Sequence, residues 1–368
     1  MTENKLRWGF LSTALIGGKN WKAIHNSGNS TMVAVASREI EKSRRFIAAC
    51  QAEAPFETVP KALGSYEELL SASDVDAIYI PLPTGIRKEW VIRAAEAGKH
   101  VLCEKPCATS VADLREMIDA CKRNKVQFMD GVMFMHSGRL DKMREVMENP
   151  EDFGQLKRIN TSFTFCGDDE FFTQNIRADS LLEPHGCLGD LGWYCIRMAL
   201  WAVKEQLPTR VTGRMLTSVP SKNGTAVVPT EFSGELFFEG GVSSGFHCSF
   251  VAHDEQSALI SGTKGWLHLP DFVIPFFGNE VKFEVGNTIY NRTVCDYNME
   301  ARRRHVILQE YSNSHSSAQE TNLFRKFANQ VRSGKLNETW PEIALKTQQV
   351  LEACLNSAYE DSRPVTLA

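Results

Sequence analysis

The first third of the chain alternates short apolar runs with longer amphipathic segments. Strands are predicted for residues 7–11, 31–37, 77–80, 100–103 and 126–130, and helices for residues 15–27, 40–50, 87–97 and 111–124. Strands that alternate with helices are typical of βαβ units, which place parallel strands in one sheet. We therefore expect an α/β fold whose first domain, residues 1–131, is a doubly wound parallel sheet.

After about Gly131 the pattern changes to consecutive strands separated by turn residues. Further strands are predicted at 156–165, 210–217, 231–238, 241–251, 257–261 and 265–269, and helices at 140–147 and across 319–360 with an interruption near Gly334. Strands joined by tight turns favour antiparallel pairing. We expect residues 132–368 to form a second α/β domain with an open, mainly antiparallel sheet.

Composition and charge narrow the classes of protein. The chain has 368 residues, 43% of them hydrophobic, and a formal net charge of −4, which gives no reason to expect a nucleic-acid partner. Its ten cysteines show no zinc-ligand spacing, so we expect no metal site. We also expect no leader peptide before the first strand, no membrane span and a cytoplasmic location.

The turn after the first strand partly matches a dinucleotide-binding fingerprint. The pattern G-x-G-x-x-G lets the backbone and a helix N-terminus approach a pyrophosphate, but here Ser12 and Ala14 replace the first two glycines and only Gly17 remains. We expect the turn to bind a dinucleotide through residues that include Ser12, Thr13, Ala14, Leu15 and Ile16.

The end of the second strand bears on which nicotinamide cofactor is bound. Ser37 stands where NAD-binding proteins have an acidic residue for the ribose hydroxyl, and Arg38 follows it. A hydroxyl and a guanidinium suit a 2′-phosphate, so we favour NADP, with NAD still possible. The alternative is that Arg38 simply faces solvent.

A third feature is the strand over residues 100–103, which runs directly into Glu104, Lys105 and Pro106. Because α/β folds bind ligands at the carboxyl ends of parallel strands, we expect Lys105 to be functional. The alternative is a surface lysine at a strand end.

Four segments taken in order give the chain a family resemblance: residues 9–17, Pro81-Leu82-Pro83-Thr84, Glu104-Lys105-Pro106 and Gly189-Asp190-Leu191-Gly192-Trp193-Tyr194. Together they resemble the glucose-fructose oxidoreductase / inositol 2-dehydrogenase (Gfo/Idh/MocA) family, in the branch with dimeric dihydrodiol dehydrogenases and NADP-dependent xylose dehydrogenases. The resemblance implies a Rossmann domain, a C-terminal α/β domain and hydride transfer between a nicotinamide and a carbon of a sugar or cyclic alcohol. It also implies a homodimer or higher oligomer paired through the outer face of the C-terminal sheet.

The resemblance also assigns roles to residues. Lys105 matches the catalytic lysine, Glu104 the adjoining cofactor-loop acid, and Pro106 a proline usually held in cis. Asp190 matches a family acid, and Tyr194 stands where many members have histidine. The remaining residues that we expect to contact the cofactor follow the strand at 77–80 or precede Asp190: Pro81, Leu82, Pro83, Thr84, Arg87 and Arg177.

The residue types suggest how the proton is handled. Alcohol oxidation needs a group that takes the hydroxyl proton, and a lysine ammonium near a tyrosine lowers the pKa of the phenol. We expect Tyr194 to carry the proton, Lys105 to tune it and bind the reacting oxygen, and Asp190 to position the substrate. Lys105 remains the alternative proton carrier, and a helix N-cap is the alternative role for Asp190.

Two further residues, Trp90 and His136, are weaker candidates for the substrate pocket, and Trp90 could equally serve in helix packing. The sequence thus predicts an NADP-dependent oxidoreductase acting on a secondary alcohol or hemiacetal carbon of a sugar or cyclic diol. The alternatives are an NAD-dependent redox glycosidase on the same fold and a non-catalytic nicotinamide-binding regulator.

Overall fold

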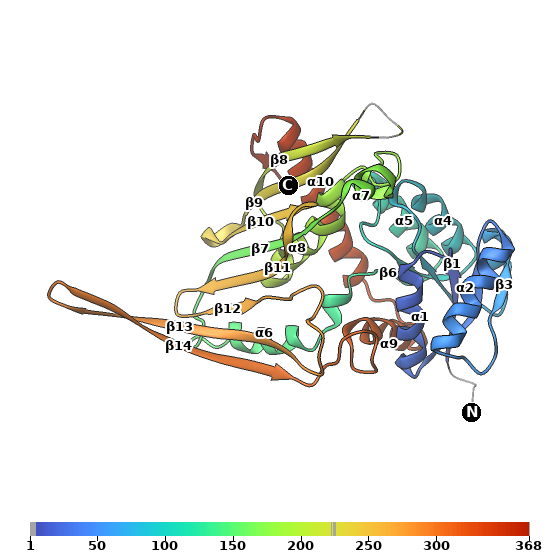
Figure 1. The fold of residues 1–368 in the computed structure, drawn as a ribbon, viewed down its shortest axis with the longest axis horizontal. Helices are drawn as coiled ribbons and strands as arrows, with labels where there is room; N and C mark the ends of the chain where they lie inside the picture. Colours follow the sequence, from blue (N-terminus) through green and yellow to red (C-terminus); the bar gives the residue numbers. More distant parts are fainter. Residues whose placement is uncertain (1–4, 222, 224–225, 368) are drawn as a thin grey trace.

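The computed structural model describes residues 5–221, 223 and 226–367, which form two sheets with helices packed against them (Figure 1). Residues 1–4, on which the expectation of no leader peptide depends in part, lie outside the described part of the chain.

The first sheet and its helices alternate along the chain, as predicted. The elements are β1 (Leu6–Leu11), α1 (Ile16–Ser27), β2 (Ser30–Ala36), α2 (Ile40–Glu53), β3 (Lys61–Leu63), α3 (Tyr66–Ser71), β4 (Ala77–Ile80), α4 (Thr84–Glu96), β5 (His100–Cys103), α5 (Val111–Arg123) and β6 (Phe128–Asp130). The strand order is β3-β2-β1-β4-β5-β6, and every pair is parallel. All residues of β4 are buried, which is typical of a strand with both faces covered by helices. The expected doubly wound parallel sheet is confirmed.

The second sheet has nine strands. After a 3₁₀ turn (Met133–His136) and α6 (Arg139–Met147), its elements are β7 (Leu156–Cys166), α7 (Asp169–Gln174), α8 (Trp193–Ala202), β8 (Arg210–Pro220), β9 (Val227–Phe237), β10 (Ser243–Ser249), β11 (Val251–Gly262), β12 (Trp266–Leu269), β13 (Val281–Thr293), β14 (Asp296–Leu308), α9 (Gln319–Arg332), α10 (Thr339–Tyr359) and β15 (Val365–Thr366). The order is β14-β13-β12-β11-β7-β10-β9-β8-β15, and the β7–β10 pair alone among these pairs is parallel in the described residues. The expected mainly antiparallel sheet is confirmed.

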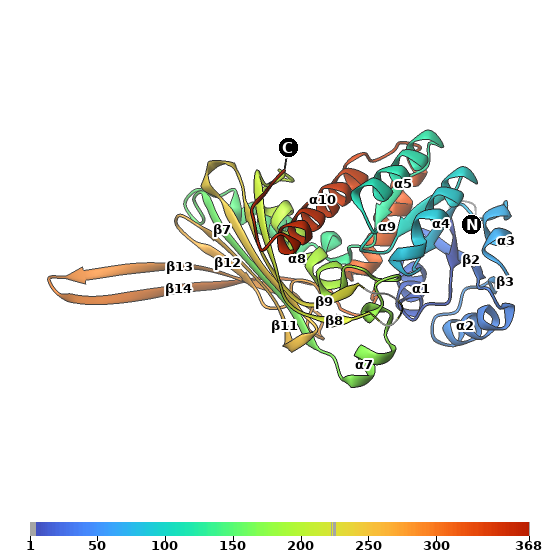
Figure 2. The ribbon, with the colours of Figure 1, turned by 90° about the horizontal axis from the view of Figure 1, so that it is seen from above.

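The helices of the second half pack against both sheets. α8 and α10 pack on one face of the nine-stranded sheet (Figure 2), whereas α9 packs against the first sheet, where Phe324 lies 5.1 Å from Trp8 between ring centroids. α10 also contacts α5 and β6 of the first half, so both C-terminal helices cross the proposed division at residues 131 and 132, which stays a prediction.

The hairpin of β13 and β14 projects far beyond the rest of the molecule (Figures 1 and 2). Its base packs inward through the buried Phe283 and Val285, but its outer part is exposed. The projection lies on the side of the nine-stranded sheet opposite α8 and α10. We call the exposed part, residues 287–302, the arm.

The segment before α8 carries Asp190 in a π-helical turn and not at a helix N-cap, the alternative role considered for it. A π-helical turn, Leu188–Gly192, precedes α8, which begins at Trp193. This wider turn still places Asp190 and Tyr194 toward the same cavity, because both side chains line it.

Within the described residues, no helix has the length and apolar character needed to cross a membrane.

Candidate functional site

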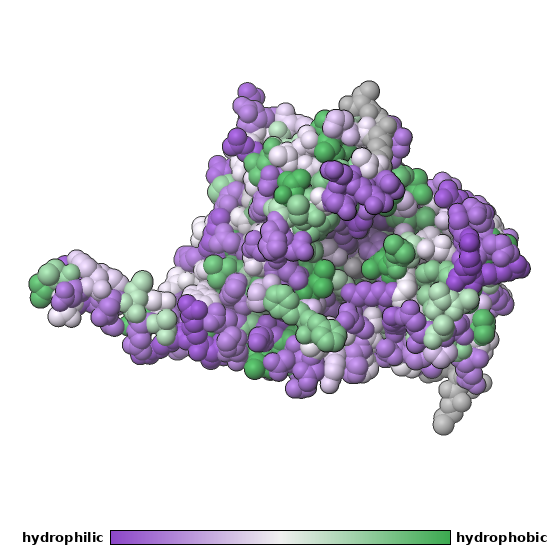
Figure 3. Space-filling model, viewed as in Figure 1, coloured by the Kyte–Doolittle hydropathy of each residue, from purple (hydrophilic) through white to green (hydrophobic). Residues whose placement is uncertain are grey.

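A deep cavity lies between the two sheets and is visible as a hollow in the surface (Figure 3). Its volume is about 1030 Å³, near the upper end of the range for small-molecule and cofactor sites. The first sheet contributes the loops after β1, β4 and β5, at the carboxyl ends of its strands. The second half contributes the π-helical turn, the start of α8, the C-terminal part of β7 and the N-terminal part of β11.

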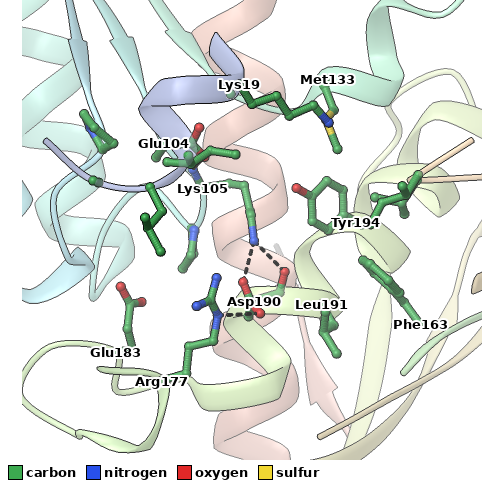
Figure 4. A pocket seen from close by; sticks show the side chains of 18 of the residues that line it. Lys19, Glu104, Lys105, Met133, Phe163, Arg177, Glu183, Asp190, Leu191 and Tyr194 are labelled. Atoms are coloured by element: carbon green, nitrogen blue, oxygen red, sulfur yellow. Dashed lines mark hydrogen bonds and ion pairs between the residues drawn. The ribbon is translucent and has the colours of Figure 1, made fainter. Parts of the chain in front are cut away.

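A buried ion cluster forms the centre of the cavity (Figure 4). Lys105 Nζ donates to Asp190 Oδ1 at 2.7 Å and to the Asp190 carbonyl oxygen at 2.8 Å. Arg177 Nε donates to the other carboxylate oxygen, Oδ2, at 2.7 Å. One carboxylate from the second half of the chain therefore holds a lysine from the first sheet and an arginine from its own domain.

The ion cluster shifts the pKa values of all three groups. Burial alone would raise the pKa of Asp190, but Lys105 and Arg177 outweigh it and hold that pKa well below its usual range. Burial alone would lower the pKa of Lys105, yet the adjacent Asp190 raises it. Asp190 likewise raises the pKa of Arg177. All three groups are therefore charged at neutral pH.

Tyr194 lies beside the ion cluster on the first turn of α8. Lys105 Nζ is 4.8 Å from the centroid of the Tyr194 ring, and the rings of Phe163 and Phe134 lie 5.6 and 6.1 Å from it. Burial raises the pKa of Tyr194 to about 12, although Lys105 acts in the opposite direction. The expectation that Lys105 would bring this pKa below its ordinary value is therefore wrong for this state. The desolvation of the phenolate raises the pKa by more than the Lys105 ammonium lowers it.

Glu104 is fixed beneath the loop that carries Lys105. Its Oε1 accepts a hydrogen bond from the Tyr79 hydroxyl at 2.6 Å, and its Oε2 accepts one from the Lys105 backbone N–H at 3.2 Å. The Lys105–Pro106 peptide bond is cis, as the resemblance implied. Through these two hydrogen bonds, the side chain of Glu104 fixes the loop that carries Lys105 against Tyr79 of β4.

Arg87 braces two loops that line the cavity. Its guanidinium donates to the carbonyl oxygens of Leu82 at 2.9 Å and Glu104 at 2.7 Å, and also to that of Pro106. Arg87 is buried, and it ties the Pro-Leu-Pro segment to the Glu-Lys-Pro segment. Its contribution to a cofactor site is therefore through the shape of both loops.

The β1–α1 turn borders the cavity through Ala14, Leu15 and Ile16. Ser12 has a φ of +136°, a backbone conformation that favours glycine, and it stands at the first glycine position of the fingerprint. Among the described residues no side chain caps the first turn of α1, and Leu15 is 98% exposed. A helix N-terminus that is open in this way fits a pyrophosphate.

Several residues expected at the cofactor do not line the cavity themselves. They are Ser12, Thr13, Ser37, Arg38 and Thr84. Ser37 and Arg38 follow β2, which pairs with β1, and so they lie at the same edge of the sheet as the β1–α1 turn. Arg38 is exposed there.

The two weaker pocket candidates lie elsewhere. Trp90 packs edge-on against Tyr66, with ring centroids 4.8 Å apart, and the Arg93 guanidinium covers it. His136 is buried, and burial lowers its pKa to about 3. The structure places neither of them at the cavity, so both have packing positions.

Other residues reach the cavity although the sequence analysis did not select them. Glu183 accepts hydrogen bonds from the Thr84 backbone N–H at 3.0 Å and from the Thr84 hydroxyl at 2.6 Å, which ties its loop to the start of α4. Lys19, two residues after Gly17, pairs with Glu320 of α9 at 3.5 Å. Proximity to the fingerprint could have identified Lys19, whereas no local pattern marks Glu183.

No group of three or more histidine, cysteine, aspartate or glutamate side chains suited to a metal ion occurs in the described part of the chain.

Comparison with known proteins gives the family. Residues 6–132 match the oxidoreductase family GFO_IDH_MocA, NAD-binding Rossmann fold, and residues 140–268 match the GFO/IDH/MocA C-terminal domain. Trans-1,2-dihydrobenzene-1,2-diol dehydrogenase of Bos taurus is 30% identical over 268 residues, which cover 72% of this chain and 74% of that protein.

Solved structures share the fold. An aldose-aldose oxidoreductase from Caulobacter crescentus, complexed with glycerol, has a TM-score of 0.79 at 21% identity and covers 99% of this chain and 100% of its own. A 3-ketoreductase from Actinomadura kijaniata in complex with NADP has a TM-score of 0.75 at 20% identity, covering 96% and 97%. The chain therefore belongs to the GFO/IDH/MocA family of NAD(P)-dependent oxidoreductases.

Proposed function

We propose that this protein is an NADP-dependent oxidoreductase that transfers a hydride between the nicotinamide and a secondary alcohol or hemiacetal carbon of a sugar or cyclic diol. The observation that carries the proposal is the meeting of Lys105 and Tyr194, from the two halves of the chain, in one cavity. Relatives named as a dihydrobenzenediol dehydrogenase and an aldose-aldose oxidoreductase support this substrate class.

The β1–α1 turn is proposed to hold the pyrophosphate of the cofactor, through the open N-terminus of α1. Ser37 and Arg38 are proposed to bind the 2′-phosphate of NADP, because Ser37 takes the place of the acidic residue of NAD-binding proteins and the Arg38 guanidinium suits a phosphate. The Glu39 carboxylate that follows them is paired with Lys42 at 2.7 Å. Arg87 donates hydrogen bonds to the loop after β4, which ends at Thr84, and to the loop after β5, which carries Lys105. Both loops extend along the cavity toward Tyr194. When bound, the nicotinamide accepts or supplies the hydride.

Tyr194 is proposed to handle the proton of the reacting oxygen. Its raised pKa keeps the phenol protonated at neutral pH, so in this state it is ready to donate a proton to an oxygen that gains charge during carbonyl reduction. In alcohol oxidation Tyr194 would first lose its own proton to solvent, and the phenolate, stabilised by the Lys105 ammonium, would then take the hydroxyl proton. Asp190 is proposed to hold Lys105 in place and to accept a hydrogen bond from a substrate hydroxyl.

We also infer a homodimer that pairs through the face of the nine-stranded sheet opposite α8 and α10. The strand register places Tyr290, Tyr297 and Met299 on one face of the arm, opposite the face of the buried Phe283 and Val285. This arm face continues the helix-free face of the sheet, and an exposed apolar ribbon is typical of a protein interface. The cytoplasmic location stays a prediction.

The test is a screen of aldoses, anhydrosugars, inositols and trans-dihydrodiols for absorbance change at the nicotinamide band, with NADP and NAD in parallel. NADPH that accumulates with a sugar or diol, and with lower KM for NADP than for NAD, supports the proposal. A cofactor that stays bound without net reduction contradicts it and favours a redox glycosidase, and the absence of any turnover favours a regulator.

A further inference from the structure

The loop between β12 and β13 presents apolar side chains to the cavity. Ile274 and Phe276 line the cavity and are 50% and 61% exposed. The next residue, Phe277, is 92% exposed but does not line it. Neighbouring exposed apolar side chains at a cavity mouth are typical of a surface that a ligand covers.

Hydrogen bonds hold this loop in one conformation. The Gln256 side chain donates to the Ile274 carbonyl oxygen and accepts from the Ile274 N–H, both at 2.6 Å. Asp271 Oδ2 accepts from the Phe276 N–H at 2.9 Å, and Asp271 Oδ1 binds the buried Arg139 at 2.6 Å. Ile274 and Phe276 are therefore exposed on a fixed backbone, which lowers the entropy cost of ligand binding.

The root of the loop belongs to the aromatic cluster around Tyr194. The buried Phe272 lies 5.7 Å from Phe134 and 6.3 Å from Phe163 between ring centroids. Both of these rings contact Tyr194, and Phe163 stands next to it on one side of the pocket in Figure 4. An apolar wall therefore runs from the proposed proton carrier to the mouth of the cavity.

The charges of the cavity do not favour an anionic substrate. Its cationic side chains in the described residues are all engaged, by carboxylates or by backbone carbonyls: Lys19, Arg87, Lys105 and Arg177. Asp254, which also lines the cavity, has no ion-pair partner among the described residues. A phosphate or nucleotide group on the substrate would find a carboxylate here without a free cation to balance it.

We propose that Ile274 and Phe276 form an apolar subsite that takes an uncharged hydrophobic group attached to the reacting diol or sugar ring, such as a second hydrocarbon ring. This inference rests on the proposed function and narrows its substrate class. The subsite favours substrates extended by apolar atoms over free polar sugars, and it disfavours phosphate esters.

Kinetics with paired substrates test the subsite. The pair is trans-1,2-dihydrobenzene-1,2-diol and trans-1,2-dihydronaphthalene-1,2-diol, which differ by one fused ring. The wild-type enzyme is expected to have the larger kcat/KM for the two-ring diol. Phe276→Ala is expected to lower the ratio of the two values about tenfold, the factor that corresponds to about 1.4 kcal/mol of lost burial. Phe276→Leu should restore part of the ratio.

Phe277→Ala is the matched control, because it removes the neighbouring exposed ring from outside the cavity; its ratio should equal that of the wild type. A Phe276→Ala ratio equal to that of the wild type, or glucose 6-phosphate used as well as glucose, would overturn the subsite.

Ligand-observed NMR with the NADP-loaded enzyme separates this inference from the proposed function. If the two-ring diol binds more tightly than the one-ring diol, and Phe276→Ala removes the difference, the subsite stands even when neither diol is oxidised. Equal binding of the two diols to the wild type overturns the subsite, whatever the enzyme turns over.

Discussion

The Lys105 ammonium donates hydrogen bonds to both the carboxylate and the backbone carbonyl of Asp190, at 2.7 and 2.8 Å. This double contact fixes the lysine relative to the π-helical turn that leads into Tyr194. The second carboxylate oxygen of Asp190 accepts a hydrogen bond from Arg177. One buried carboxylate therefore fixes the positions of both cations beside the proposed site of proton transfer.

Asp190→Asn is expected to destabilise the protein. The amide would leave Lys105 and Arg177 as neighbouring cations without a counter-charge, at a cost of roughly 3 kcal/mol in the free energy of unfolding. The pKa of Lys105 should fall as well, because burial remains while the opposing carboxylate is lost. Urea denaturation measures the first effect, and the pH profile of kcat/KM measures the second.

Asp254→Asn provides the control, since that carboxylate also lines the cavity but has no ion-pair partner in the part of the chain that the structure describes. We expect a change below about 0.5 kcal/mol there. Equal stability of the Asp190→Asn variant and the wild type would show that the ion cluster does not stabilise the fold.

Arg38→Ala is expected to weaken NADP binding and leave NAD binding nearly unchanged. A hydrogen bond to a charged group contributes about 1.5–3 kcal/mol, so the Kd for NADP should rise about 10- to 100-fold. Isothermal titration calorimetry with NADP and with NAD measures both constants. Arg115→Ala, an exposed arginine of α5, is the matched control. Equal losses for NAD and NADP would contradict the assignment of Arg38 to the 2′-phosphate.

Acid is expected to destabilise the fold through two buried histidines. Burial lowers the pKa of His136 to about 3 and that of His185 to about 4. Because an unfolded histidine titrates near about 6.5, only the unfolded chain gains these protons between that pH and about 4. The free energy of unfolding should therefore fall as the pH falls, by up to about 2.7 kcal/mol per pH unit for the two groups together. Asp190 keeps its charge in this window, because its pKa is lowered.

Urea denaturation at several pH values between 7 and 5 measures this slope. His136→Gln should remove about half of it, whereas His315→Gln, at an exposed position, should not change it. A free energy of unfolding that is the same at both ends of the range contradicts the prediction.

Replacement of residues 288–301 by Asn-Gly is expected to weaken the proposed dimer. The change removes the exposed faces of Tyr290, Tyr297 and Met299 but keeps the base of the hairpin. Sedimentation velocity should give a dimer dissociation constant at least about tenfold higher, a loss of about 1.4 kcal/mol. A wild-type protein that is monomeric at all concentrations would contradict the dimer, and equal dissociation constants would contradict the role of the arm.

Single substitutions refine that test. Tyr297→Ala should weaken the dimer, while Tyr359→Ala at the end of α10 should not, although the two side chains are similarly exposed at 60% and 61%.

Most of the first sheet could be predicted from the sequence because its inner strands are short and largely apolar, but the pattern did not predict the three-residue edge strand β3. β4, for example, is four buried residues followed by a proline. The arm could not be predicted in this way. Its strands lack a buried face, so no alternation of apolar and polar residues marks them as strands in the sequence.

Only the part of the site that has a local sequence signal or a family match could be predicted. Lys105 follows a recognisable strand, and the family resemblance selected Asp190 and Tyr194. Glu183 and Gln256 act through tertiary contacts with Thr84 and Ile274, and no spacing along the chain encodes these contacts. The raised pKa of Tyr194 depends on burial by distant aromatic residues, which the pairing with Lys105 alone could not show.

The most direct test of the central claim follows deuterium from the alcohol carbon of a substrate found in the screen. We predict that the wild type transfers it to carbon 4 of the nicotinamide. Tyr194→Phe should do so about 10²- to 10³-fold more slowly, because it lacks the group that exchanges the proton, while the Kd for NADP stays unchanged. Deuterium lost to water, or equal rates for the two proteins, would contradict the account.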